Sequence, residues 1–548
     1  MKLVMYAVLI CSVWCVVQAQ TGGTLRANFQ LDAQQYSQDT IIKAEQPPEK
    51  VSSMGFLSLI YSYDKFEAGM RYEGFFNPLV GIDPKYTGSG IPFRYAMYRN
   101  DEVEATVGNF YEQFGSGMIL RLYQDWALGV DNSIDGLRIK ATPLNGLQLT
   151  GVVGKQRSYF SLGPGIVRGV DADINLNEMD IFGQGWLGDD VQVRLGASGV
   201  SKYQPSSDPL LKIPLNVFAY STRARVSSGG FNVYGEWAYK INDPSEANSK
   251  SFNPGNGLYV SAAYSGTGLG VNLIFKRIDN MDFRSDRAAA INSLTLSFLP
   301  ALTKQHTYRL ATMFPYATQP NGEIGLQGEV VYTFPKNSFL GGKYGTTVTV
   351  NYANLHNLDS TLTDTSVNRF TYDSKFFAFG KTLLFNDLNI EVSHIWSKSF
   401  KSTVMFATQS YQRDIIEGKN EYGLIHPTIA VLEGTYTINS TNALRCELQH
   451  LGVSADSVKA DKNNWAFGLL EYTYNSNWYF TVFDEWNYGN HNEQEKIHYY
   501  SGAVAFVKNT TRVSFGYGRQ RAGILCVGGV CRVVPAANGL TLSVTSSF

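Results

Sequence analysis

Oxygen-bearing side chains at every second position form the most distinctive local pattern of the chain. Residues 167–178 read VRGVDADINLNE. Clustered carboxylate and amide oxygens suit calcium, but an EF-hand loop beginning at Asp171 requires glycine sixth and glutamate twelfth. The chain has Leu176 and Phe182 at those positions. A β-strand accounts for the pattern better, because Asp171 and Asp173 then share one face and the apolar residues between them share the other.

Further charged residues occur two or four apart on predicted strands. In a membrane-crossing strand such charges must point inward, because exposure to lipid is costly. Inside a β-barrel made of such strands, these charges would line a solute path or hold a plug. Alternatively, they would only stabilise the lumen of the barrel through ion pairs, without a transport role. The residues predicted to line the lumen are Arg71, Glu73, Arg121, Asp125, Arg138, Lys140, Arg168, Asp171 and Asp173.

The sequence gives little support for an enzyme. The seven histidines form no HExxH motif or closely spaced pair, and the chain has no GxSxG elbow and no Walker loop. We therefore expect no catalytic residue, no metal site and no cofactor. A Ser–His pair contributed by two different strands remains an open alternative.

Two cysteines are placed to form a disulfide. Cys526 and Cys531 flank Val-Gly-Gly-Val, and a turn at the two glycines would bring them opposite each other on two strands. Two thiolates with no neighbouring ligand fall short of a zinc site. Cys446 lies within a predicted strand, where we expect a buried small apolar side chain.

The first 19 residues predict a secretory signal peptide. Lys2 precedes the apolar run 3–17, and Val17-Gln18-Ala19 is a small-residue cleavage site, so the mature chain would begin at Gln20. The basic and acidic residues are balanced, with a formal net charge of −1. This balance gives no electrostatic reason to expect nucleic acid as a partner.

Alternation with a period of two residues recurs along almost the whole chain, as in 147–153, 191–198, 231–240, 478–486 and 511–520. These segments read as strands with one polar and one apolar face. In the C-terminal quarter, short polar turns alternate with longer connections, which is typical of outer-membrane barrels. A tight turn at Asn386-Asp387 and a long loop at 414–422 do not both fit this alternation.

These patterns predict an all-β fold: one large antiparallel transmembrane β-barrel over residues 20–548. At about 20 residues per strand and connection it would have roughly 22 to 28 strands. A barrel of this size needs water, a plug or infolded loops in its lumen. The plug candidates are 34–51, 242–257 and 280–290.

The last strand is expected at 539–548 (GLTLSVTSSF), and closure would pair it with a first strand at 24–31. Aromatic residues near strand ends, such as Trp478 and Trp486, suit the interfacial girdles of a membrane barrel. They would also suit a carbohydrate-binding surface on a soluble β-protein.

Several segments carry a resemblance to known proteins. They are 108–121 (GNFYEQFGSGMILR), 165–176 (GIVRGVDADINL), 447–452 (ELQHLG) and 529–548 (GVCRVVPAANGLTLSVTSSF). Together they resemble a porin-like outer-membrane family of the Bacteroidota with no established molecular function. The terminal Phe548 resembles the C-terminal signal that the barrel-assembly machinery reads in such proteins. The resemblance implies outer-membrane lipid and that machinery as partners, and it supplies no catalytic or substrate residues.

Three functional hypotheses follow. The first is an outer-membrane channel for small solutes, and the second is an interaction barrel that supports surface secretion or adhesion through its external loops. The third is a soluble secreted carbohydrate-binding protein. Export and location in the outer membrane are expected under the first two.

Overall fold

The computed structural model describes residues 22–179, 188, 190–206, 213–289, 292–366, 370–420, 422–453, 463–528 and 530–548. The predicted signal peptide at residues 1–19 lies outside these ranges. Among the residues described, no helix is long and apolar enough to cross a membrane.

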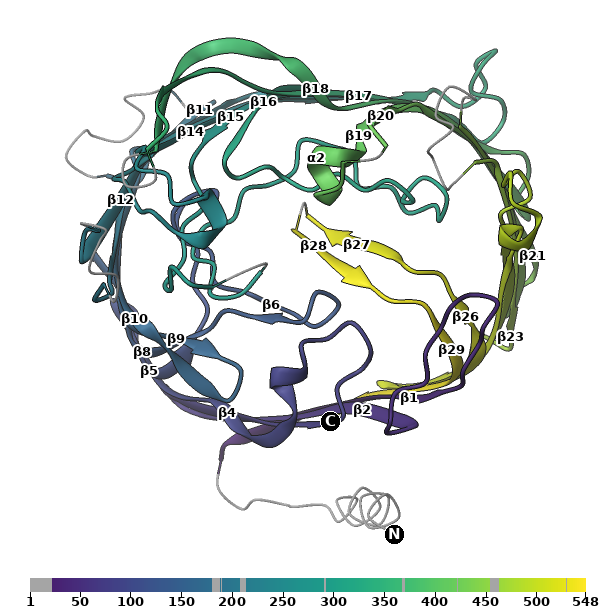
Figure 1. The fold of residues 1–548 in the computed structure, drawn as a ribbon, viewed down its shortest axis with the longest axis horizontal. Helices are drawn as coiled ribbons and strands as arrows, with labels where there is room; N and C mark the ends of the chain where they lie inside the picture. Colours follow the sequence, from purple (N-terminus) through teal and green to yellow (C-terminus); the bar gives the residue numbers. More distant parts are fainter. Residues whose placement is uncertain are drawn as a thin grey trace.

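The described chain forms one closed antiparallel β-barrel, viewed along its axis in Figure 1. The main sheet has 25 strands, of which β20 (Leu424–Ile425) is a two-residue strand beside the end of β19, so the wall itself has 24. Each wall strand pairs with its neighbours in the chain, and β1 pairs with both β2 and β29. The prediction of an all-β barrel with 22 to 28 strands is confirmed.

The first half of the wall consists of β1 (Thr24–Tyr36), β2 (Val51–Tyr63), β3 (Phe66–Phe76), β4 (Gly88–Arg99), β5 (Val103–Phe110), β8 (Ile134–Leu144), β9 (Leu147–Ser158), β10 (Ser161–Asn175), β11 (Val191–Tyr203), β12 (Asn216–Ser228), β13 (Phe231–Lys240) and β14 (Gly255–Gly266). The second half consists of β15 (Leu269–Asp279), β16 (Gly322–Phe334), β17 (Thr346–Asp364), β18 (Thr371–Ile395), β19 (Phe400–Gln412), β21 (Pro427–Asn439), β22 (Asn442–Val453), β23 (Trp465–Tyr474), β24 (Trp478–Trp486), β25 (His498–Lys508), β26 (Thr511–Gln520) and β29 (Ala537–Ser547).

The smaller elements lie in the connections. They are η1 (Pro84–Tyr86), β6 (Gln124–Asp125), β7 (Val130–Asp131), η3 (Glu246–Asn248), α2 (Arg413–Glu417), η4 (Glu493–Glu495), β27 (Gly523–Val527) and β28 (Val530–Val534).

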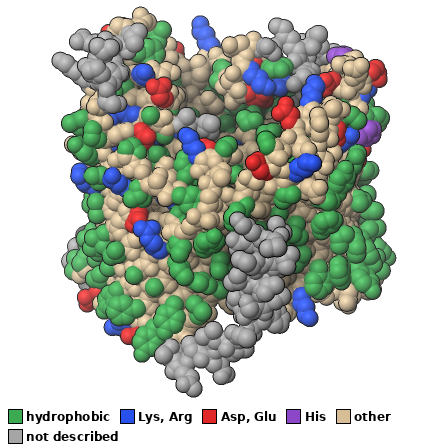
Figure 2. Space-filling view, turned by 60° about the horizontal axis from the view of Figure 1, so that its bottom comes forward, with side chains coloured by type: hydrophobic (Ala, Val, Ile, Leu, Met, Phe, Trp, Pro, Cys, Tyr) green, Lys and Arg blue, Asp and Glu red, His purple; other side chains and the backbone are tan. Residues whose placement is uncertain are grey.

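Alternation along the strands gives the wall an apolar outside and a mixed inside. In β24, Trp478, Phe480, Val482 and Trp486 are exposed on the outer face, whereas Glu485 is buried. The two tryptophans stand at opposite ends of the strand. Figure 2 shows hydrophobic side chains gathered over the lower part of the wall, with charged side chains nearer the upper rim. This is the arrangement by which a closed β-sheet crosses a bilayer.

The two ends of the barrel differ in loop length. At the end that holds the start of β1, most connections are short, such as 64–65, 440–441 and 509–510. At the other end most are long, up to the 42 residues of 280–321. We call these the short-turn end and the long-loop end.

The prediction of a turn at Asn386-Asp387 is wrong. Both residues lie inside β18, the longest strand, opposite Asn354 and Ala353 of β17. Asp387 and Asn389 face inward and are buried, so this polar run belongs to the lumen side of a strand. Because β18 is continuous, the connection 413–426 lies at the long-loop end, as the alternation of short and long connections requires.

The closing seam joins the two ends of the barrel sheet. β29 lies between β26 and β1, with Gly539 to Ser547 opposite Tyr36 to Asn28. The backbone of Phe548 exchanges hydrogen bonds of 2.9 and 3.1 Å with that of Ala27. β1 extends to Tyr36, beyond the predicted end at Leu31.

Several long connections fold into the lumen. In Figure 1 the hairpin β27–β28, the β6 segment and α2 all lie inside the ring of strands. Connections 111–133 and 280–321 share one apolar core with inward-facing wall residues. Connections 37–50 and 280–321 share a second, and a third contains Ile82, Tyr86 and Trp126. The infolded connections are therefore packed against the wall.

Candidate functional site

Four buried charges tie one infolded connection to the wall. Arg71 and Glu73 lie on the inner face of β3, Arg157 at the end of β9 and Asp131 on connection 111–133. Arg157 donates to Glu73 and to Asp131, each at 2.6 Å, and Arg71 donates to Glu73 at 2.7 Å and to Asp131. All four side chains are at most 8% exposed. Because every charge has partners of opposite sign, the cluster satisfies the requirement for burying ions.

A second buried cluster holds two other connections. Asp243, on connection 241–254, accepts from Lys202 of β11 and, at 2.8 Å, from Arg287 of connection 280–321. Arg287 also donates to the backbone carbonyl oxygens of Gln204 and Pro214. One carboxylate thus joins the wall to two loops.

Connection 280–321 places cations against acidic wall residues further round the barrel. Arg309 of this connection donates to Glu485, and His306 lies 2.6 Å from Asp387. Arg521, which follows β26, also donates to Glu485. These contacts give the connection a charge complementary to the wall beside it.

The wall itself is divided into two arcs of opposite charge. Side-chain alternation assigns the inward-facing residues, and cations predominate from β8 to β15 whereas carboxylates predominate from β16 to β24. The first set is Arg138, Lys140, Arg194, Lys202, Arg223, Arg225, Lys240 and Lys276, with Asp171, Asp173 and Glu236 among them. The second set is Glu323, Glu329, Asp387, Glu391, Glu433, Glu447, Glu471 and Glu485, with Lys401 and Arg445 among them. We call these the basic arc and the acidic arc.

Some of these charges have no oppositely charged partner among the residues that the structure describes. Arg194 and Arg225 of the basic arc form no ion pair with any residue that the structure describes, and the same holds for Glu329 and Glu471 of the acidic arc. Charges of opposite sign on different parts of the wall contribute an electric field within the lumen.

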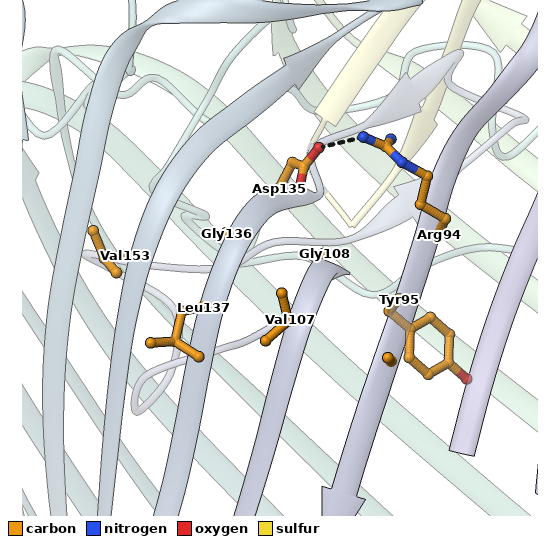
Figure 3. A pocket seen from close by; sticks show the side chains of 9 residues that line it. Arg94, Tyr95, Val107, Gly108, Asp135, Gly136, Leu137 and Val153 are labelled. Atoms are coloured by element: carbon orange, nitrogen blue, oxygen red, sulfur yellow. Dashed lines mark hydrogen bonds and ion pairs between the residues drawn. The ribbon is translucent and has the colours of Figure 1, made fainter. Parts of the chain in front are cut away.

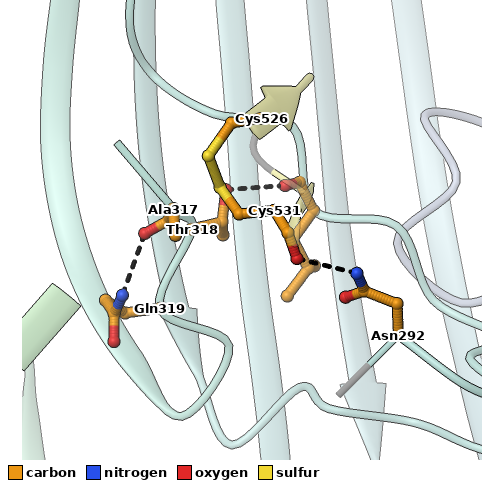
Figure 4. The surroundings of a disulfide bond; sticks show 7 residues. Asn292, Ala317, Thr318, Gln319, Cys526 and Cys531 are labelled. Atoms are coloured by element: carbon orange, nitrogen blue, oxygen red, sulfur yellow. Dashed lines mark hydrogen bonds between the residues drawn. A yellow bond between two sulfur atoms is a disulfide. The ribbon is translucent and has the colours of Figure 1, made fainter. Parts of the chain in front are cut away.

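The hairpin β27–β28 reaches three other infolded connections. Cys526 and Cys531 are paired across it and joined by a disulfide. Figure 4 shows this disulfide beside Asn292 and residues 317–319 of connection 280–321, and Asn292 donates to the carbonyl oxygen of Cys531 at 2.8 Å. Arg532 donates to the carbonyl oxygens of Gly81 and Ala127 at 3.0 and 2.5 Å. The hairpin therefore links connections 77–87, 111–133 and 280–321 across the lumen.

Burial of the infolded connections changes the acidity of their side chains. Loss of solvent raises the pKa of Tyr123 to about 12 and lowers the pKa of the Arg121 and Arg532 guanidinium groups. All three side chains are half-buried.

Most residues predicted to line the lumen lie on the inner side of the wall. Arg71 and Glu73 belong to the buried cluster described above. Arg138 donates to Glu104 at 2.6 Å, and Lys140 pairs with Glu112 at 2.8 Å. Asp171 and Asp173 both accept from Arg223, at 2.8 and 2.9 Å. No group of residues suited to hold a metal ion occurs in the described ranges.

Three of the predicted residues lie elsewhere. Arg121 and Asp125 are on the infolded connection 111–133, where the Arg121 guanidinium stacks 3.7 Å from the ring centre of Phe298. Arg168 is exposed on the outer wall, and its prediction as a lumen residue is wrong. It has the same parity along β10 as the outward-facing Val170, whereas Asp171 and Asp173 have the opposite parity.

Sequence reasoning missed Asp131, Arg157, Asp243 and Glu485. Glu485 was detectable from the alternation of β24, since it shares a face with Thr481 and Phe483. Asp131 and Asp243 lie in connections, where no periodicity shows that they fold inward.

The closed wall, its apolar outer face and its charged, loop-filled interior define a transmembrane-type β-barrel. The sequence matches DUF6029, a family of unknown function, over residues 1–548, and the chain belongs to this family. No curated protein matches it.

Solved structures with a similar fold are bacterial outer-membrane barrels. The ferric enterobactin receptor PfeA of Pseudomonas aeruginosa, as the R480A_Q482A mutant, has a TM-score of 0.42 and 10% identity, covering 96% of this chain and 81% of the receptor. The translocation pore of the P pilus usher PapC has a TM-score of 0.36 and 8% identity, covering 96% of this chain and 99% of the pore. The outer membrane protein opdK of Pseudomonas aeruginosa has a TM-score of 0.36 and 11% identity, covering 70% of this chain and 94% of opdK. What those proteins bind or carry is a property of those proteins.

Proposed function

We propose that the protein is an outer-membrane channel for small polar solutes, and that the loops folded into its lumen restrict passage. The observation that carries this proposal is the pair of opposed charged arcs inside a closed 24-strand wall. A wall of this size encloses more space than its own side chains fill.

The opposite charges of the two arcs suggest which class of solute would pass through the lumen. A solute with separated positive and negative groups would align across the lumen, with its anionic end toward Arg194 and Arg225 and its cationic end toward Glu329 and Glu471. Because both signs are present, we expect weak selectivity between simple cations and anions and better passage of dipolar solutes than of strongly charged ones.

The hairpin β27–β28 is the element we expect to limit passage. It contacts three other infolded connections, and its own base is fixed to the wall by the pair between Arg521 and Glu485 at 2.8 Å. Its removal would leave the 24 wall strands intact, since β27 and β28 form a separate two-stranded sheet.

Swelling of proteoliposomes tests the proposal. We compare the wild type with a variant in which residues 523–534 are replaced by a short Gly-Ser linker, using a neutral sugar and a zwitterionic amino acid as solutes. We expect slow swelling for the wild type and faster swelling for the variant. A control with a shortened 335–345 connection, at the short-turn end, should behave like the wild type.

Absence of swelling in both the wild type and the variant lacking the hairpin would refute the channel. A stable, impermeable barrel of that kind would instead favour the interaction barrel that presents its external loops to partners.

A further inference from the structure

The outer wall contains an apolar groove near the long-loop end of β5, β8 and β9. Figure 3 shows Val107, Leu137 and Val153 side by side on these three strands. The groove has a volume of about 800 Å³, and Gly108 and Gly136 contribute to its floor. At Gly136 any Cβ would lie 2.0 Å from the Val153 carbonyl oxygen, so the strands approach too closely there for a side chain.

A second groove of about 430 Å³ adjoins the first and shares Leu137 and Val153 with it. Its other apolar walls are Ile139, Val170 and Phe218, all exposed on the outer face. Gly151 and Gly199 leave its floor without side chains. Together the two grooves form a continuous apolar trough on the surface that faces lipid.

Arg168 lies in the second groove. Its side chain is exposed and forms no ion pair with any residue in the described part of the chain. A lipid-facing arginine without a counter-charge is costly, so such a residue is expected to find an anion.

Further charges surround the trough on the side of the long loops. Arg168 is opposite Val153 and Lys155 is opposite Ile166, which makes the two cations diagonal neighbours on one face. Lys155 also forms no ion pair with a described residue. Arg94 and Asp135 pair with each other at 3.2 Å at the end of the first groove, as Figure 3 shows. The patch of Arg94, Asp135, Lys155 and Arg168 therefore has a surplus of positive charge.

We propose that Arg168 and Lys155 bind the phosphate of an anionic membrane lipid, one acyl chain of which lies in the trough. The guanidinium fork of arginine fits phosphate oxygens in a bidentate manner, and the lysine adds a second cation. The apolar trough continues from the charged patch toward the short-turn end, where the chain of a bound lipid would extend. This site lies outside the barrel and is separate from the proposed solute path.

Native mass spectrometry of the purified full-length protein tests the site. The protein is delipidated in mild detergent and mixed with phosphatidylglycerol or phosphatidylcholine at equal concentrations. We expect the wild type to retain phosphatidylglycerol preferentially, and the double variant Arg168→Gln, Lys155→Gln to retain about tenfold less of it. Lys398→Gln removes one cation in a turn at the short-turn end and should retain as much lipid as the wild type.

A second variant tests the trough without changing its charge. Gly151 has no atom within 4 Å of an added Cβ, so Gly151→Leu should fold and fill the floor of the groove. We expect it to lose retained lipid as well. Equal retention of the two lipids by the wild type, full retention by the double variant, or displacement of the lipid by inorganic phosphate alone would overturn the proposal.

Discussion

Replacement of Asp131 by asparagine should release connection 111–133 from the wall. The Asp131 carboxylate accepts from two buried guanidinium groups, those of Arg71 and Arg157, and from the backbone nitrogen of Ser133 at 3.1 Å. The amide of asparagine keeps the shape but removes the charge, so Glu73 would be the one carboxylate left in the described cluster for both arginines. Two charge-assisted hydrogen bonds contribute about 1.5–3 kcal/mol each, and breaking a buried pair costs about 3–5 kcal/mol.

Hydrogen exchange followed by mass spectrometry measures this release. The amides of Leu122 and Asn132, which bond to backbone oxygens within the connection, should exchange on the order of 100-fold faster, since 1.4 kcal/mol corresponds to a factor of ten. Amides of β24 should not change, because the wall does not depend on this contact.

Asp125→Asn is the matched control for this measurement. It removes the same charge from the same connection. Among the described residues, however, the Asp125 side chain accepts only from the Leu128 backbone nitrogen, at 3.2 Å, and forms no ion pair. The reasoning fails if Asp131→Asn leaves exchange in 111–133 unchanged, or if the control accelerates it equally.

Three further predictions concern the seam, the hairpin and the arcs. Gly539 has φ +149° and an added Cβ would lie 1.8 Å from the Gln35 carbonyl oxygen. Gly539→Ala should cost about 1–3 kcal/mol and lower the temperature at which the barrel unfolds on a detergent gel, whereas Gly151→Ala should not. Loss of the disulfide in C526S/C531S should loosen the hairpin by about 2 kcal/mol and raise its hydrogen exchange without unfolding the wall. Glu329→Gln should shift the reversal potential in a salt gradient toward anion preference; no shift would contradict an acidic arc that acts on ions.

The sequence is sufficient to predict the wall and insufficient to predict its interior. Strands such as β24 and β26 follow from alternation alone, because each has one face against lipid. The contact of Glu73 with Arg157 joins residues 84 apart in the chain, and no local pattern encodes it. Asp387 was mistaken for a turn residue because a polar inward face and a polar turn have the same composition.

The error at Arg168 has a different origin. The periodicity of β10 places it with Val170 on the outer face, but the rule that charges avoid lipid favoured the lumen. A conflict between periodicity and charge therefore marked the residue on which the proposed lipid site depends.

Single-channel recording in planar bilayers tests the central claim most directly. We predict discrete conductance steps for the wild type and larger steps for the variant in which a linker replaces 523–534, because the wall remains closed while the obstruction is removed. If neither protein conducts at any voltage, although both run as folded, heat-modifiable barrels on gels, the lumen is not a solute path.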